Sequence, residues 1–175
     1  MSCAQSFRIR DAGPSDVEVL AQLHVDTFNE THAPVLRNGP TYEIRERQWR
    51  AVLNADDSHQ FTFAVEDDEG KMIGFAKGQP YASPDLPDFD GELNKIYLLR
   101  RYHRRGIGRR LLGHVVRRFL EQGVNSIVLF GTADNPSNGF YEALGAERLR
   151  GPNGEFHGAY GWRDLRPVAA RCADT

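Results

Sequence analysis

The segment with the clearest chemical meaning is a pair of glycines among arginines, Arg104-Arg105-Gly106-Ile107-Gly108-Arg109. It falls between a predicted strand and a predicted helix. The first turn of a helix presents backbone N–H groups without partners in the helix, together with a partial positive charge. Glycines let that backbone approach a bulky anion because no Cβ intervenes, and arginines add donors for phosphate oxygens. The segment therefore predicts a binding site for a phosphate or pyrophosphate group.

Two common nucleotide-binding motifs do not fit this segment. A P-loop requires Gly-Lys followed by Ser or Thr, whereas Gly108 is followed by Arg109-Arg110. A dinucleotide-binding fingerprint requires a third glycine, and Leu111 occupies that position. The anion is therefore expected to belong to another kind of ligand.

Hydrophobic periodicity predicts the elements that position this segment. Strands are expected at residues 7–10, 61–65, 72–76, 93–99, 126–130 and 156–162, and helices from Pro14 and at residues 42–53, 107–122 and 137–144. In the second helix the expected buried residues are Ile44, Trp49, Val52 and Leu53. The order β-α-α-β-β-β-α-β-α-β, without a repeat or linker, predicts one domain over residues 7–165 with helices on a mixed sheet. Residues 1–6 and 167–175 are expected to be flexible termini.

Composition and charge exclude several classes of protein. The 175-residue chain has 40% hydrophobic and 26% charged residues, which is typical of a globular protein. No apolar run approaches the roughly 18–20 residues of a membrane span, and the N-terminus lacks a signal-peptide core, so a cytoplasmic protein without membrane contact is expected. Cys3 and Cys172 lie in the terminal segments without metal-ligand spacing. No metal site is expected, and a disulfide between the two stays open.

The run from Tyr97 to Gly108 resembles the acyl-CoA-binding motif of the GNAT superfamily of N-acyltransferases, whose pattern is Gln/Arg-x-x-Gly-x-Gly/Ala. His103 occupies the first position here, and both glycines are present. A second segment, Asn135 to Ala146, resembles the family's Asn…Phe-Tyr-x-x-Leu-Gly-Phe sequence, with one residue fewer between Asn and Tyr than in many members. The element order also fits the family along residues 7–165.

The resemblance implies an α/β (α+β) fold, a single GNAT-like domain whose mixed, mostly antiparallel sheet splays between strands 4 and 5. Acetyl-CoA would bind there as co-substrate, and its acetyl group would pass directly to a primary amine of a small molecule or peptide. Asn135 would contact the CoA or, equally well, cap the following helix. The expected CoA contacts are Ile96, Tyr97, Leu98, His103, Arg104, Arg105, Gly106, Ile107, Gly108, Arg109 and Asn135.

The same resemblance implies two catalytic candidates. Tyr141 would donate a proton to the leaving thiolate, and its alternative role is that of a core aromatic beside Phe140. Glu92, placed 11 residues before His103, would be the base. The alternative is that Glu92 is only a surface carboxylate, and that water takes the proton from the amine.

Charge patterning leaves the acceptor and two other functions open. Asp85, Asp88, Asp90 and Glu92 would attract an ammonium group, which favours a cationic acceptor, unless the loop is simply polar. The first alternative function is a non-catalytic acyl-CoA sensor. The second is a nucleic-acid-binding module built on the eight arginines from Arg100 to Arg118. A net charge of −2 argues against that module, so no nucleic-acid partner is expected, while a homodimer is an open possibility.

Overall fold

A computed structural model of the chain describes residues 6–32 and 39–173, so Cys3 lies outside the described residues and a disulfide to Cys172 stays open. The strands are β1 (Phe7–Asp11), β2 (Phe61–Asp67), β3 (Met72–Pro80), β4 (Gly91–Leu98), β5 (Ile127–Phe130), β6 (Glu147–Arg150) and β7 (Phe156–Trp162). The α-helices are α1 (Val17–His32), α2 (Tyr42–Leu53), α3 (Ile107–Glu121), α4 (Asn138–Ala143) and α5 (Arg166–Arg171). Short 3₁₀ helices, Pro14–Asp16 and Arg100–Tyr102, precede α1 and α3.

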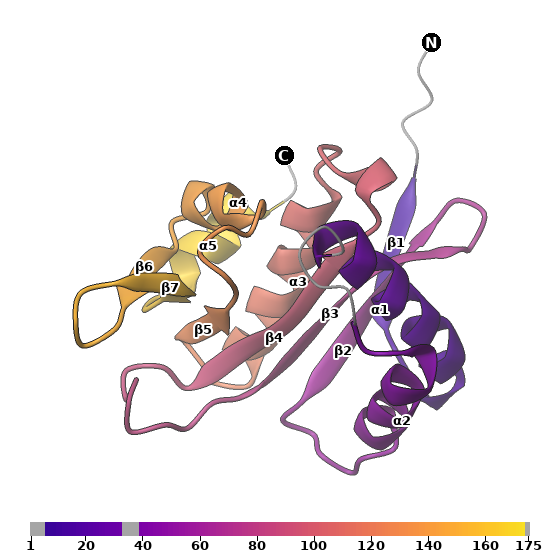
Figure 1. The fold of residues 1–175 in the computed structure, drawn as a ribbon, viewed down its shortest axis with the longest axis horizontal. Coiled ribbons are helices and arrows are strands. Elements are labelled where there is room, and N and C mark those ends of the chain that lie inside the picture. Colours follow the sequence, from indigo (N-terminus) through magenta and orange to yellow (C-terminus); the bar gives the residue numbers. More distant parts are fainter. Residues whose placement is uncertain (1–5, 33–38, 174–175) are drawn as a thin grey trace.

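These strands form one sheet in the order β1-β2-β3-β4-β5-β7-β6. Neighbours run antiparallel except for β4 and β5, which run parallel. Helices α1 and α2 cover one face of the sheet, and α3 lies on the other (Figure 1). The predicted fold class, a single mixed-sheet domain with helices on both faces, is confirmed.

The ladder between β4 and β5 is short. Gly91 pairs with Ile127 and Glu92 with Val128, and no further pair follows although β4 continues to Leu98. On its other side β5 pairs with β7, so that β5, β7 and β6 form a wing that diverges from β4 (Figure 1). The predicted splay between the fourth and fifth strands is confirmed, and it leaves the end of β4 with a free edge.

An irregularity in β4 decides which side chains face α1 and α2. Leu93 and Lys95 pair with consecutive residues of β3, which leaves Asn94 without a partner there. Side chains alternate between the two faces of a strand, so one extra residue moves all later side chains to the opposite face. Leu93 and Lys95 consequently lie on opposite faces of β4. Leu93 packs in the hydrophobic core, and Lys95 lies on the same face as Glu92, the one that α1 and α2 cover.

Helix α2 packs against the core through Trp49, Val52 and Leu53 as expected, but it buries Arg45 and not Ile44. Trp49 is 1% exposed and Arg45 is 8% exposed, whereas Ile44 is 39% exposed. Residues four apart lie on the same side of a helix, so Arg45 follows Trp49 toward the sheet. The Arg45 guanidinium lies over the ring of Phe28, 5.3 Å from its centroid. The prediction of a buried Ile44 was wrong because an aromatic ring on α1 accommodates the arginine.

The last part of the chain contains two elements that the sequence analysis did not predict. Strand β6 has the sequence Glu-Arg-Leu-Arg, in which only one residue is apolar. Helix α5 occupies the segment expected to be a flexible terminus from residue 167, and that expectation was wrong for residues 167–173. Leu165 is fully buried, and Val168 and Cys172 are each 2% exposed. These three apolar residues have helical spacing and anchor α5 to the core.

His24 lies in an aromatic cluster between α1 and the sheet. It is 2% exposed, and its ring centroid lies 5.8, 5.2 and 5.4 Å from those of Trp49, Phe75 and Tyr97. Its Nδ1 has no hydrogen-bond partner among the described residues. Burial, followed by the positive charges of Arg45 and Lys95, lowers the pKa of His24 to about 3. The imidazole is therefore neutral in the folded protein at neutral pH.

This neutral histidine should make the protein sensitive to acid. Between pH about 6.5 and 3 only the unfolded chain binds the extra proton, so stability falls as the pH falls, by up to about 1.4 kcal/mol per pH unit. His24→Phe should remove this contribution. Melting temperatures at pH 7 and pH 5 should then differ less in the variant than in the parent. His59→Phe, on the exposed surface, is the matched control. An equal acid sensitivity in His24→Phe and the parent would contradict the buried neutral state.

Candidate active site

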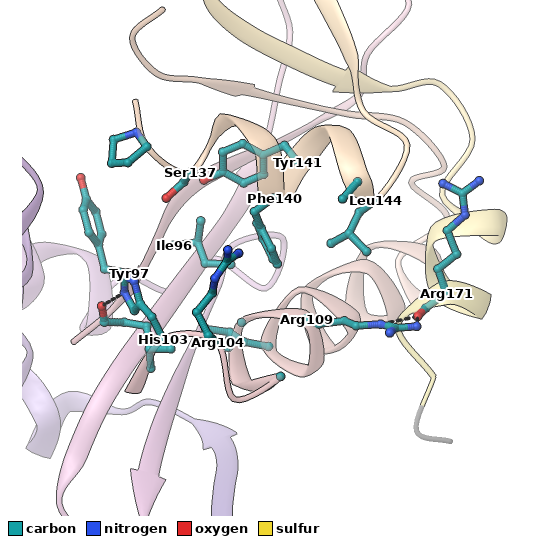
Figure 2. Close-up of a pocket in the computed structure, with 16 residues that line it drawn as sticks. Ile96, Tyr97, His103, Arg104, Arg109, Ser137, Phe140, Tyr141, Leu144 and Arg171 are labelled. Atoms are coloured by element: carbon teal, nitrogen blue, oxygen red, sulfur yellow. Dashed lines mark hydrogen bonds between the residues drawn. The ribbon is translucent and has the colours of Figure 1, made fainter. Parts of the chain in front are cut away.

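A cavity of about 890 Å³ opens where β4 and β5 separate. Its walls come from β4, the loop before α3, α4 and α5 (Figure 2). This volume lies in the usual range for small-molecule sites. The structure brings most of the predicted CoA contacts to this cavity, namely Ile96, Tyr97, Leu98, His103, Arg104, Gly106, Gly108 and Arg109.

The loop before α3 forms one end of the cavity. Arg104 and Gly106 have left-handed backbone conformations, with φ values of 62° and 78°. Left-handed residues between right-handed ones turn successive N–H groups toward one side, where an anion can be held. The first N–H bonded within α3 belongs to Arg110 and donates to the Gly106 carbonyl at 3.1 Å. Three N–H groups at the start of the helix therefore have no partner within it: Ile107, Gly108 and Arg109.

Side chains around this loop explain why its glycines matter. A Cβ at Gly108 would lie 3.6 Å from the ring of Phe140, so a larger side chain would fill the space in front of the helix. Ile107 is 4% exposed and packs into the core, and Arg105 lies over the ring of Tyr102 at 5.4 Å. Neither of these two lines the cavity. The contact of both residues with CoA stays a prediction. For Ile107 the contact would be made by its backbone N–H, because its side chain is buried.

Two further contacts fix the cavity rim. His103 Nε2 lies 2.7 Å from the carbonyl oxygen of Leu98 and so ties the loop to the end of β4 (Figure 2). The Nε of Arg109 donates to the carbonyl oxygen of Arg171 at 2.6 Å. Arg171 also lines the cavity. It was missed in the sequence analysis because α5 was not predicted.

Tyr141 lies at the boundary between this cavity and a second one of about 90 Å³, and lines both. It is 6% exposed, and its ring centroid lies 5.8 Å from that of Tyr160 and 6.3 Å from that of Trp162. Burial, with smaller contributions from Tyr97 and Tyr160, raises the pKa of its phenol. No hydrogen bond of this hydroxyl group is found within the described part of the chain. The phenol is thus a protonated donor available to a ligand.

The smaller cavity lies between α1, β4 and the chain after β5. Thr31 of α1, Lys95 of β4 and Phe130 of β5 are among the residues that line it. Asn135 also lines it, and its Oδ1 accepts a hydrogen bond from the N–H of Ser137 at 2.8 Å. Asn135 therefore shapes the turn before α4, whose N-cap residue is Ser137, and does not cap the helix itself. Its contact with CoA stays a prediction.

The predicted acidic cluster does not line either cavity. Both carboxylate oxygens of Glu92 accept hydrogen bonds, from Gln79 Nε2 at 2.6 Å and Asn94 Nδ2 at 3.2 Å. Asp88 forms an ion pair with Arg163 at 2.5 Å. Asp85 and Asp90 are exposed. Three basic residues that were not singled out in the sequence lie on this side of β4 instead. Arg45 and Lys77 are buried, and Lys95 is half-buried and lines the smaller cavity.

Residues 19–146 match the acetyltransferase (GNAT) family. The chain belongs to this family. It is 32% identical to the uncharacterized N-acetyltransferase YuaI of Bacillus subtilis, over 90% of this chain and 93% of the relative. It is 30% identical to the phosphinothricin N-acetyltransferase of Streptomyces viridochromogenes, over 90% of this chain and 83% of that enzyme.

The fold agrees with that assignment. The PaiA N-acetyltransferase of Thermoplasma acidophilum, solved in complex with coenzyme A, superimposes with a TM-score of 0.68 at 20% identity, covering 89% of this chain and 98% of that one. The protein is an acetyl-CoA-dependent N-acetyltransferase, as the sequence motifs predicted. Within the described residues, no helix is long and apolar enough to cross a membrane, and no group of three or more metal-ligating side chains occurs.

The open space in front of α3 leads to a prediction for the acetyltransferase. Gly108→Leu keeps a good helix former but fills that space, so acetyl-CoA affinity should fall about tenfold or more. Arg104→Ala removes a side chain and leaves the backbone N–H groups, so it should cost less. Isothermal titration with acetyl-CoA measures both, with Gly108→Ala as the size control. A larger loss in Arg104→Ala would mean that side chains, and not the backbone, hold the phosphates.

Proposed function

We propose that this acetyltransferase acetylates the primary amine of a small molecule or peptide by direct attack on acetyl-CoA bound between β4 and β5. One observation carries the proposal. The cavity at the free edge of β4 joins a helix N-terminus at one end to a protonated phenol at the other. The first suits a pyrophosphate, and the second suits a thiolate leaving group.

The free edge of β4 supports a place for the pantetheine arm. Residues Ile96 to Leu98 line the cavity and have no partner strand on the β5 side. Their backbone groups can pair with the amides of the arm in the way that a strand pairs with its neighbour. The thioester would then lie toward Tyr141. The pyrophosphate would lie at the start of α3, beside Arg104 and Arg109.

The proposed reaction has no covalent enzyme intermediate. The acceptor first loses its ammonium proton, to water or to Glu92, because only a neutral amine is a nucleophile. Its nitrogen attacks the thioester carbonyl carbon, a C–N bond forms, and the oxygen carries the negative charge, which a backbone N–H can stabilise. The C–S bond then breaks, and Tyr141 donates its proton to the sulfur. The nitrogen gives up its second proton, which returns through water to the phenolate of Tyr141. The products are an acetamide and free CoA.

The two cavities support separate binding of the two substrates. The larger one contains the helix N-terminus and suits the donor, while the smaller one reaches Tyr141 from the α1 side and suits the acceptor. One relative acts, by its name, on phosphinothricin, which supports a small-molecule acceptor. The acidic residues that favoured a cationic acceptor lie outside both cavities, so a cationic acceptor is not part of the proposal.

Binding of the donor should stabilise the folded protein. A ligand that binds only the folded state adds about 2.7 kcal/mol at a concentration of 100 times its Kd. Acetyl-CoA should therefore raise the melting temperature in a concentration-dependent way, measured by differential scanning fluorimetry. ATP and NAD should have much smaller effects. An unchanged melting temperature at millimolar acetyl-CoA would contradict the proposed donor site.

Removal of one hydroxyl group should separate chemistry from binding. Tyr141→Phe should lower kcat by about 100-fold, because general-acid groups contribute at least that much, and should leave the acetyl-CoA affinity nearly unchanged. Tyr160→Phe is a matched control, since that phenol is also buried but donates to Glu142 and lines neither cavity. Equal kcat in Tyr141→Phe and the parent would leave Tyr141 as a core aromatic.

A further inference from the structure

Three positive side chains gather on the face of the sheet that α1 and α2 cover. Lys77 of β3 is 4% exposed and Arg45 of α2 is 8% exposed. Lys95 of β4 is paired with Lys77 across the sheet and lines the smaller cavity. Arg45 and Lys77 lie close enough to Lys95 to lower its pKa. Lys95 thus brings a positive charge into the wall of the smaller cavity, and the other two positive charges lie near it.

None of these three side chains forms an ion pair with a carboxylate in the described part of the chain. Each donates instead to a neutral amide oxygen, and the Arg45 Nε, which is buried, has no partner there. Lys95 Nζ donates at 2.9 Å and the Arg45 guanidinium at 3.1 Å. The acceptors are the carboxamide oxygens of Gln79 for Lys77, Asn94 for Lys95 and Gln48 for Arg45.

One carboxylate, Glu92, lies at the centre of this network. It accepts hydrogen bonds from the same two amides, Gln79 and Asn94, whose oxygens accept from the lysines. Glu92 therefore orients both lysines through the amides without pairing directly with either. Asp57 is a second carboxylate that acts on Lys77. Two negative charges thus face three positive ones, which leaves an excess of one positive charge at a largely buried site.

Such an excess is unfavourable in a protein interior. An unpaired buried cation costs several kcal/mol because it loses its hydration. Burial lowers the pKa of Lys95 to about 8, and it also lowers those of Lys77 and Arg45. Perturbed cations beside a cavity are typical of ligand sites, because the ligand supplies the missing charge.

We propose that the acceptor of this enzyme carries an oxyanion, of which a carboxylate is the simplest, and that Lys95 binds it on the α1–α2 side of β4, with the positive charges of Arg45 and Lys77 close behind it. The inference rests on the proposed function, because it takes the smaller cavity as the acceptor site. Lys95 and Tyr141 line that same cavity. An amino acid or a similar amine held by its anionic group at Lys95 can therefore present its nitrogen toward the thioester.

The charge of Lys95 predicts how the preference depends on pH. The groups that face it are Arg45 from α2, Lys77 from β3, Glu92 from its own strand and neutral His24 from α1. With a pKa of about 8, Lys95 is positive below pH 8 and neutral above it. The preference for anionic over neutral acceptors should therefore decline as the pH rises through 8.

Matched acceptors test the proposal on the purified enzyme with acetyl-CoA. β-Alanine, propylamine and diaminopropane have the same carbon chain and differ in the charge at the far end. Leucine and leucinamide form a second pair, in which the amide has the less basic amine and so the larger neutral fraction. From the rate of free thiol release, kcat/KM should be at least tenfold higher for the carboxylate in each set. In the leucine pair this preference must also overcome the larger neutral fraction of the amide.

Variants at Lys95 separate charge from structure. Lys95→Met should raise KM for the carboxylate acceptors about tenfold or more and leave the neutral amines and acetyl-CoA binding unchanged. Lys95→Arg should retain the preference, and Lys95→Glu should shift it toward diaminopropane. Lys71→Met, exposed on the turn between β2 and β3, is the matched control and should behave as the parent. Melting temperatures with and without acetyl-CoA report whether each variant is folded.

The outcomes distinguish the inference from the proposed function. A parent enzyme that prefers propylamine or diaminopropane, or a folded Lys95→Met with an unchanged preference, overturns the oxyanion site while acetyl transfer stands. Thiol release with none of these amines, although acetyl-CoA binds, also overturns it. Failure of acetyl-CoA to bind at all would instead count against the proposed function.

Discussion

The separation of β4 from β5 is the constraint on which the rest of the site depends. Backbone N–H and C=O groups in a protein interior need partners, and the last residues of β4 have none on the β5 side. A ligand that carries amides can supply those partners. A sheet whose strands were all fully paired would have no free backbone groups for such a ligand. The wing formed by β5, β7 and β6, with α4 packed on it, then brings Tyr141 to the opening.

In the proposed function, the two sides of β4 bind the two substrates through different kinds of group. On the donor side the important groups belong to the backbone, at the strand edge and at the start of α3. On the acceptor side they are side chains, and the extra residue at Asn94 decides which ones face inward. Without this extra residue, Lys95 would lie on the same face of β4 as Leu93 and would point into the hydrophobic core. A single irregularity therefore creates a charged wall beside an apolar interior.

The sequence predicted the fold and many of the residues that line the larger cavity because those features depend on local patterns. Glycines before a helix and alternating strands can be recognised from a short stretch. The basic wall depends on pairing between distant residues: Arg45 meets Lys95 only after α2 packs on the sheet, and Lys95 changes face through an irregularity that no residue type marks. The acidic residues Asp85, Asp88, Asp90 and Glu92 line neither cavity, and a short stretch of sequence does not reveal this, since Asp88 pairs with Arg163 from far along the chain.

Helix α5 makes the chain's last described turn part of the donor cavity. Its Arg171 carbonyl holds Arg109, and Cys172 packs so closely on α3 that a Cβ at Gly113 would lie 3.0 Å from its own. A fusion partner or purification tag joined at this end would therefore emerge beside the cavity mouth and crowd the entering nucleotide.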